Sequence, residues 1–129
     1  MPWRKHNGAL QFLLITTRTT QRWIVPKGWP LRNLSPSECA AREALEEAGV
    51  VGEIGPKSLG AFQYTKRRKD GVTLPVRIEV FAMEVMRQRR TWEEKSFRQT
   101  CWCSLDEALE RVAEPGLRRL IVKFAKDMH

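Results

Sequence analysis

Apolar and polar residues follow two spacings along this chain, one typical of β-strands and one typical of α-helices. Residues 9–17 (ALQFLLITT) form a nearly continuous apolar run of strand length, and residues 23–26 (WIVP) form a shorter β-prone segment. Residues 100–103 (TCWC) have the same character. The pattern therefore predicts three short strands outside the middle of the chain.

The middle of the chain predicts a long β-hairpin. Residues 59–64 read as a strand, and in residues 75–86 successive side chains alternate between two faces. The basic run 66–70, which ends on Asp and precedes Gly71, marks a turn between them.

Residues 36–48 predict an amphipathic helix with signals at both ends. Ser35 is a suitable N-cap, Pro36 suits the first helical position, and Glu38 completes a capping box. Gly49 can adopt the left-handed conformation that ends a helix. Apolar residues gather on one side of this helix: Ala40, Ala41, Ala44, Leu45 and Ala48.

Two further helices are predicted near the C-terminus. Ser104 and Glu107 form a second capping box, which opens a helix that runs to about Val112. Apolar residues then recur at helical spacing to the end of the chain, at Leu117, Leu120, Ile121 and Phe124. We find no internal repeat or linker, and we expect residues 1–129 to form a single domain.

Composition places the chain among ordinary globular proteins. Apolar residues make up 42% and charged residues 29% of its 129 positions, and no apolar run approaches the roughly 18 residues that span a bilayer. The first residues, MPWRKHNG, lack the apolar stretch of a signal peptide. We therefore expect a cytoplasmic protein without a membrane partner.

Cysteine and histidine provide little catalytic chemistry. Cys101 and Cys103 share one face of a predicted strand, but no C-x-x-C pair is present for zinc or redox work, and we interpret the thiols as buried and reduced. His6 and His129 lie near the termini, which argues against histidine-based catalysis.

Three glutamates on the predicted helix are the strongest candidates for chemistry. Glu43, Glu46 and Glu47 are spaced i, i+3 and i+4, so their side chains share one face and repel one another. They also lie in the C-terminal half of the helix, where the helix dipole disfavours anions. A solvated acidic stripe is one interpretation. A site for Mg²⁺ or Mn²⁺, which prefer hard oxygen ligands, is the other.

The segment around these glutamates resembles the Nudix box, G-x5-E-x7-R-E-U-x-E-E-x-G-U, in which U is a bulky aliphatic residue. Ala44 replaces an aliphatic residue of the box, and Leu34 replaces its first glutamate. The resemblance implies an α/β/α sandwich with a mixed central β-sheet. The matching positions are Gly28, Arg42, Glu43, Glu46, Glu47, Gly49 and Val50.

The resemblance also implies hydrolysis of a phosphoanhydride bond. In that interpretation Glu43 and Glu47 bind magnesium, with help from a backbone carbonyl near Lys27, and the cation activates water. Glu46 acts as a ligand or as the general base, and Arg42 orients the box.

Leu34 raises the question of which carboxylate replaces the missing glutamate. Glu38 lies about 140° from Glu43 around the helix axis and is better interpreted as the capping residue. Four carboxylates outside the box remain open: Asp70, Glu79, Glu93 and Glu94.

The net charge of +8 favours an anionic partner, and basic residues cluster at the predicted hairpin turn and near the box. Within the family, the chain is similar to diphosphoinositol polyphosphate and diadenosine polyphosphate hydrolases, on the basis of R-W-I-V-P at residues 22–26 and W-E-E at residues 92–94. Lys27 and Trp29 depart from a glycine-rich run in that subgroup. Three roles are therefore open for Trp29: it stacks on a base of the substrate, it caps a sugar ring, or it only packs against the protein. The resemblance implies these candidate substrate-binding residues: Thr16, Thr17, Arg18, Lys27, Gly28, Arg67 and Arg98.

Two other functions remain open from the sequence. Basic clusters also suit RNA, so an RNA 5′-end pyrophosphohydrolase is one alternative. The loss of a box glutamate at Leu34 allows a second, a non-catalytic binding module. The sequence leaves the oligomeric state undetermined.

Overall fold

The fold is built on a six-stranded mixed sheet, which a computed structural model describes over residues 1–27 and 30–128. Five strands run in the order β3-β2-β1-β7-β4, and β8 pairs with β2. Among the described strands of this sheet, only the β1–β7 pair is parallel, which makes the sheet mixed as expected. The strands are β1 (Pro2–His6), β2 (Ala9–Thr16), β3 (Trp23–Ile24), β4 (Val50–Ile54), β7 (Met83–Gln88) and β8 (Thr100–Cys103).

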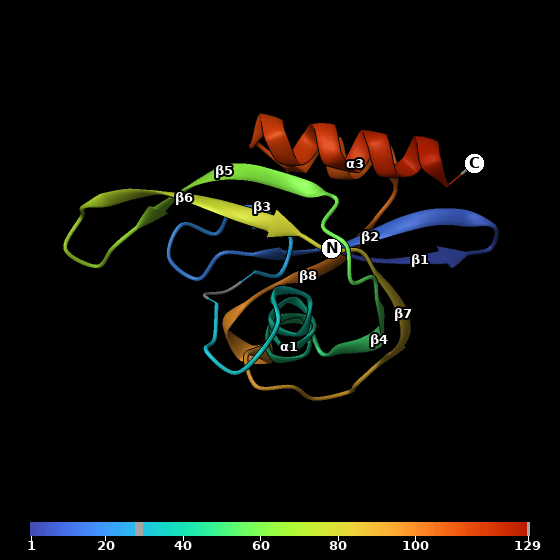
Figure 1. Cartoon of the computed structure of the whole chain (residues 1–129), viewed down its shortest axis with the longest axis horizontal. Coiled ribbons are helices and arrows are strands. Elements are labelled where there is room, and N and C mark those ends of the chain that lie inside the picture. The colour runs from blue at the N-terminus through green and yellow to red at the C-terminus, as the bar shows by residue number, and fades with distance from the viewer. Residues whose placement is uncertain (28–29, 129) are drawn as a thin grey trace.

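A second sheet is the antiparallel hairpin of β5 (Gly60–Arg67) and β6 (Thr73–Val80). Figure 1 shows this hairpin extending beyond the central sheet at one end of the molecule. The predicted turn is present, although β5 continues through Arg67 into its basic run.

In residues 1–27 and 30–128, three α-helices flank the strands. They are α1 (Pro36–Ala48), α2 (Leu105–Arg111) and α3 (Pro115–Asp127), and a 3₁₀ turn spans Lys95–Phe97. Helices α1 and α3 lie on opposite sides of the strands, which gives the layered arrangement expected from the sequence (Figure 1). None of the helices in the described ranges has the length and apolarity needed to cross a membrane.

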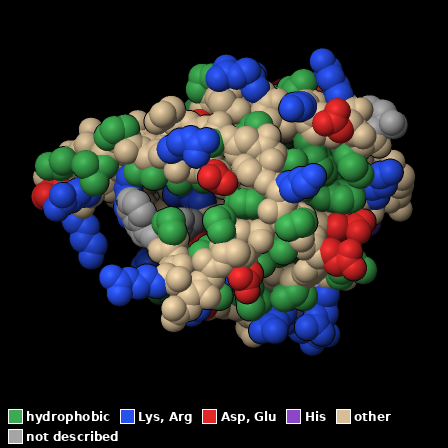
Figure 2. All heavy atoms as spheres, viewed as in Figure 1, with side chains coloured by type: hydrophobic (Ala, Val, Ile, Leu, Met, Phe, Trp, Pro, Cys, Tyr) green, Lys and Arg blue, Asp and Glu red, His purple; other side chains and the backbone are tan. Residues whose placement is uncertain are grey.

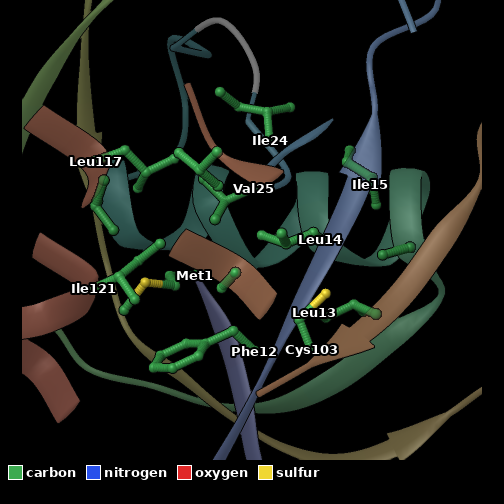
Figure 3. Packing of buried hydrophobic residues seen from close by; sticks show 14 of the residues in the cluster. Met1, Phe12, Leu13, Leu14, Ile15, Ile24, Val25, Cys103, Leu117 and Ile121 are labelled. Carbon is green, nitrogen blue, oxygen red and sulfur yellow. The ribbon is translucent and has the colours of Figure 1, made fainter. Parts of the chain in front are cut away.

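The core explains the apolar run of β2. Phe12, Leu13, Leu14 and Ile15 are all fully buried, so both faces of this strand are covered. Figure 3 shows them packed with residues of α3, β3 and β8. A strand covered on both faces has a continuous apolar sequence rather than an alternating one.

The prediction of one strand over residues 75–86 was wrong. Strand β6 ends at Val80 and β7 begins at Met83, and the two belong to different sheets. Val80 and Phe81 are consecutive and both buried, which breaks the alternation expected of one strand. The chain crosses between sheets here, and Ala82 accepts a hydrogen bond from the backbone of Gly55 instead of continuing the hairpin.

Two strands were not predicted. Strand β1 has the sequence PWRKH and β4 the sequence VVGEI, and neither has a full strand of alternating residues. Strand β1 pairs with β2 and β7, and β4 pairs with β7. Their structure therefore depends on these partner strands rather than on their own sequence patterns.

Candidate functional site

Helix α1 has the boundaries and caps that its sequence predicts. The Ser35 hydroxyl accepts a hydrogen bond from the Glu38 backbone at 3.2 Å, and the Glu38 carboxylate accepts one from the Ser35 backbone at 2.9 Å. Gly49 ends the helix at φ 71°, with its N–H donated to Leu45. The capping role of Glu38 is confirmed, and its bonds to Ser35 lower the pKa of its carboxyl.

Glu47 is a buried carboxylate, with 5% of its surface exposed. One oxygen accepts the Lys27 backbone N–H at 2.9 Å, and the other lies 3.3 Å from the Arg98 guanidinium. Burial nevertheless raises the pKa of Glu47 to about 8, against the opposing effects of the Arg98 charge and the Lys27 hydrogen bond. Burial therefore outweighs these two partners in setting the pKa of Glu47.

Arg98 links three parts of the site. Its Nε donates to Glu94 at 3.0 Å, one terminal nitrogen to the Thr16 carbonyl at 3.0 Å, and the other to Glu47. Only 12% of its side chain is exposed. The candidate substrate contact thus lies at the site, but all three of its nitrogens already bond to the protein.

Glu43, Glu46 and Glu94 complete an acidic group around Glu47. Burial raises the pKa of Glu43, and the charges of Glu46 and Glu94 raise it further. The Glu94 backbone N–H donates to the Glu46 carbonyl at 3.0 Å, which brings the loop after β7 against α1. Arg42 bonds to Glu46 at 2.9 Å across one helical turn.

Of the four carboxylates left open by the sequence, the structure brings Glu94 to the box glutamates. Asp70 pairs with Arg68 at the hairpin turn, and Glu79 pairs with Arg77 on β6. The W-E-E segment was the available signal for Glu94, but only the fold separates it from its exposed neighbour Glu93.

The acidic group fits a divalent cation by its chemistry. All of its donors are carboxylate oxygens, which suit Mg²⁺ or Mn²⁺. A bound cation would also favour the ionised forms of Glu43 and Glu47, whose pKa values burial raises. In the part of the chain that the structure describes, however, no three His, Cys, Asp or Glu side chains converge on one point. Glu46 is turned toward Arg42 in a solvent-accessible ion pair. Such a pair is weak enough for Glu46 to leave Arg42 for another partner.

Thr16 and Thr17 support the site through their hydroxyls. Thr16 accepts a hydrogen bond from the Gln99 backbone at 2.9 Å. Thr17 accepts one from the Arg22 backbone at 3.0 Å. Both side chains are buried, so they fix the loops around the site.

The remaining candidate substrate residues occupy different parts of the surface. Lys27 is half-buried with its ammonium 4.0 Å from the centre of the Tyr64 ring, and burial lowers its pKa. Arg18 is exposed and stacks over Phe97 at 4.4 Å. Arg67 is exposed at the end of β5. The expectations for Gly28 and Trp29 lie outside the described residues.

Basic side chains extend along one end of the molecule. Figure 2 shows Lys and Arg side chains at the projecting end of the β5–β6 hairpin. The sequence places four consecutive basic residues there, 66–69, of which 67–69 are exposed. This end of the hairpin therefore has a positive surface that attracts anions.

A cavity of about 350 Å³ lies beside the acidic group. Lys27, Glu43, Arg77 and Glu79 supply charged groups to its lining, and Leu34 is part of the same wall. The leucine that replaces the box glutamate therefore adds an apolar side chain to a wall that also has charged residues. Other lining residues include Pro26, Cys39, Val76, Ile78, Val80 and Phe81.

Comparison with curated proteins finds relatives in plants and animals. The chain is 35% identical over 125 residues to Nudix hydrolase 21, chloroplastic, of Arabidopsis thaliana. This alignment covers 95% of this chain and 61% of the relative. It is 33% identical over 100 residues to mouse diphosphoinositol polyphosphate phosphohydrolase 3-alpha, and this alignment covers 76% of this chain and 57% of the relative. The chain thus spans less than two thirds of the length of these relatives.

Solved structures share the fold. An Ap4A hydrolase of C. elegans superposes with a TM-score of 0.69 at 20% identity, covering 99% of this chain and 93% of the other. The NUDIX domain of Shewanella oneidensis NrtR, complexed with ADP ribose, gives a TM-score of 0.71 at 17% identity, covering 99% and 84%. Residues 4–124 match the family model of the NUDIX domain. The chain therefore belongs to the NUDIX family.

Proposed function

We propose that this chain is a Mg²⁺- or Mn²⁺-dependent hydrolase that cleaves phosphoanhydride bonds in a nucleoside-diphosphate-linked or highly phosphorylated small molecule. The observation that carries the proposal is the acidic group itself. Three glutamates lie on one helix face, and the backbone hydrogen bond from Glu94 to Glu46 brings a fourth carboxylate from a distant loop to the same helix.

We assign different roles to the four carboxylates. Glu43, Glu47 and Glu94 would hold the cation, which when bound supplies Lewis-acid and water-activating chemistry. Glu46 pairs with Arg42 near the surface, and we assign it as the general base toward the attacking water. Arg42 holds Glu46 until that step, and Arg98 fixes the orientation of Glu47 and Glu94.

The cavity and the basic surface support a substrate with an apolar ring and several phosphates. Lys27, Arg18 and Arg67 provide cations for the phosphates. The apolar residues of the cavity wall, which include Leu34, suit a nucleobase better than an inositol ring with its hydroxyls and phosphates. Among the activities in the names of the relatives, the cavity therefore favours a dinucleoside polyphosphate over a diphosphoinositol polyphosphate.

The domain and location assignments remain proposals. We propose that residues 1–129 act as one domain, consistent with the family match over 4–124. A cytoplasmic location stays a prediction, since relatives of this chain have chloroplastic and mitochondrial names.

A phosphate-release screen with Mg²⁺ tests the activity. Diadenosine polyphosphates, diphosphoinositol polyphosphates, nucleotides and triphosphorylated RNA are the substrates to compare. We expect the highest kcat/KM for a diadenosine polyphosphate. A preference for RNA would identify an RNA-end pyrophosphohydrolase instead, and affinity without turnover at any metal concentration would identify a binding module.

Glutamate substitutions test the site. Glu46→Gln and Glu47→Gln should each reduce hydrolysis by at least about a hundredfold, as expected for loss of a general base or a metal ligand. Glu53→Gln, on an exposed position of β4, is the matched control and should keep the full rate. If both box variants hydrolyse substrate at the parental rate, the assignment of this site is wrong.

A further inference from the structure

Two thiols lie in contact on one face of β8, apart from the acidic group. Cys101 and Cys103 are both free, and their sulfurs are 3.4 Å apart. Cys103 is fully buried, and Figure 3 shows it in the core beside Leu13. Cys101 is only partly buried, so it is the member of the pair that a small molecule in solution can reach.

The Arg111 guanidinium contacts both sulfurs. One terminal nitrogen of Arg111 lies 2.7 Å from the Cys101 sulfur and 3.5 Å from that of Cys103. The guanidinium also stacks over the Trp23 ring at 5.0 Å, which fixes its position. A positive charge there opposes capture of a metal cation by the thiols, and it lies against the sulfur that solvent can reach.

We propose that Cys101 and Cys103 form a redox-active dithiol, which a hydroperoxide converts to an intrachain disulfide. The Cys101 thiolate attacks the peroxide oxygen, the O–O bond breaks, and Cys101 becomes a sulfenic acid while the peroxide leaves as an alcohol or water. The Cys103 sulfur then attacks the Cys101 sulfur and loses its proton, and the hydroxyl group leaves as water. Both thiols are oxidised, and the peroxide is reduced.

The electrostatics of the pair agree with this order of events. Burial raises the pKa of Cys103 to about 12, and its hydrogen bond to Cys101 and the charge of Cys101 add to the effect. Cys103 therefore does not react first. Once Cys101 is a neutral sulfenic acid, its charge no longer opposes ionisation of Cys103, whereas the Arg111 charge remains.

The strand allows the bond but strains it. The sulfurs must approach from 3.4 Å to about 2.05 Å. Residues two apart on an extended strand have Cα atoms roughly 6.6 Å apart, near the upper limit for a disulfide. Strained disulfides are readily reduced, so the bond should form reversibly. Among the described strands, β8 pairs only with β2, which leaves its other edge free to bend.

Intact mass spectrometry of the full chain tests the proposal. After treatment with hydrogen peroxide, we expect the parental chain to lose about 2 Da, the mass of two hydrogens, and to regain it with dithiothreitol. Cys39→Ser is the matched control, since Cys39 lies on α1 and bonds to the Leu31 backbone, and it should behave like the parent. Peptide mapping should place the bond between Cys101 and Cys103.

Three variants separate the roles of the residues. Cys103→Ser should stop at a sulfenic acid on Cys101 that dimedone traps, and Cys101→Ala should show no 2 Da loss, so a folding failure in one leaves the other informative. Arg111→Gln should slow disulfide formation by roughly tenfold, while Arg119→Gln, an exposed control on α3, should not. An unchanged mass in the parent, a bond that involves Cys39, or a parental rate in Arg111→Gln would overturn the proposal.

Discussion

At the scale of single residues, Glu47 shows how the fold sets the chemistry of a side chain. A glutamate on a helix surface is ordinarily ionised, but here burial raises its pKa to about 8. The Lys27 backbone and Arg98 hold its two oxygens in place. The residue is therefore held in one orientation, and burial disfavours its charged form.

This raised pKa predicts a pH dependence of stability. Between pH 4.5 and about 8 the folded chain keeps a proton on Glu47 that the unfolded chain releases, so the free energy of unfolding falls as pH rises through this window. The buried amine of Met1, with its pKa lowered to about 5, acts in the opposite direction. The comparison with Glu47→Gln isolates the contribution of Glu47.

We expect Glu47→Gln to melt at about the same temperature as the parent at pH 5 in EDTA and at a clearly higher temperature at pH 8. Thermal melts followed by circular dichroism would measure the difference. A difference that stays constant from pH 5 to pH 8 would show that Glu47 titrates normally.

Residue-level chemistry was only partly predictable from the sequence. The three box glutamates were visible because they lie within five residues on one helix. The sequence did not single out Glu94, because its position beside the box glutamates depends on a backbone hydrogen bond to Glu46 from a distant loop. The role of Arg98 was also hidden, since its partners Thr16 and Glu47 are 82 and 51 residues away.

At the scale of elements, Gly49 connects the end of α1 to the loop that contains Glu94. Its φ of 71° disfavours any side chain, and a Cβ at this position would lie 2.2 Å from the Trp92 ring. Trp92 opens the W-E-E segment, so the contact positions the acidic loop against the helix.

Gly49→Ala should therefore destabilise the chain by more than about 2 kcal/mol, the sum of a left-handed backbone cost and a steric clash. Gly71→Ala is the matched control, because Gly71 has φ 88° and open space around it. It should lose only about 1–2 kcal/mol, and hydrolysis should fall only in Gly49→Ala. Urea unfolding would measure both, and equal losses would contradict the role of Trp92.

Elements with local signals were predictable, and those defined by distant partners were not. Helix α1 and its caps depend on Ser35, Glu38 and Gly49, which lie within or next to the helix. The break between β6 and β7 depends instead on packing at Phe81, which no local pattern indicates. Strand β1 forms because β2 and β7 lie on either side of it.

At the scale of the whole molecule, a net charge of +8 and the basic end of the hairpin predict a salt-dependent reaction. Long-range attraction of a polyanionic substrate is screened as ionic strength rises. We expect kcat/KM for a polyphosphate to fall a few-fold between about 50 and 200 mM salt, mainly through KM.

The double variant Arg67→Gln, Arg68→Gln should weaken this salt dependence, because it removes two charges from the turn. Steady-state kinetics at several salt concentrations would measure it. A salt dependence equal to that of the parent would indicate that the hairpin does not attract the substrate.

The long sequence separation between Glu47 and Arg98 has a consequence for synthesis on the ribosome. The acidic face of α1 leaves the ribosome 51 residues before the guanidinium that will pair with it. During that interval the growing chain lacks both Arg98 and β8, the strand that follows Arg98 and pairs with β2. The acidic group is therefore assembled late in translation, and a nascent chain arrested before residue 98 would contain the three box glutamates without the arginine that orients Glu47.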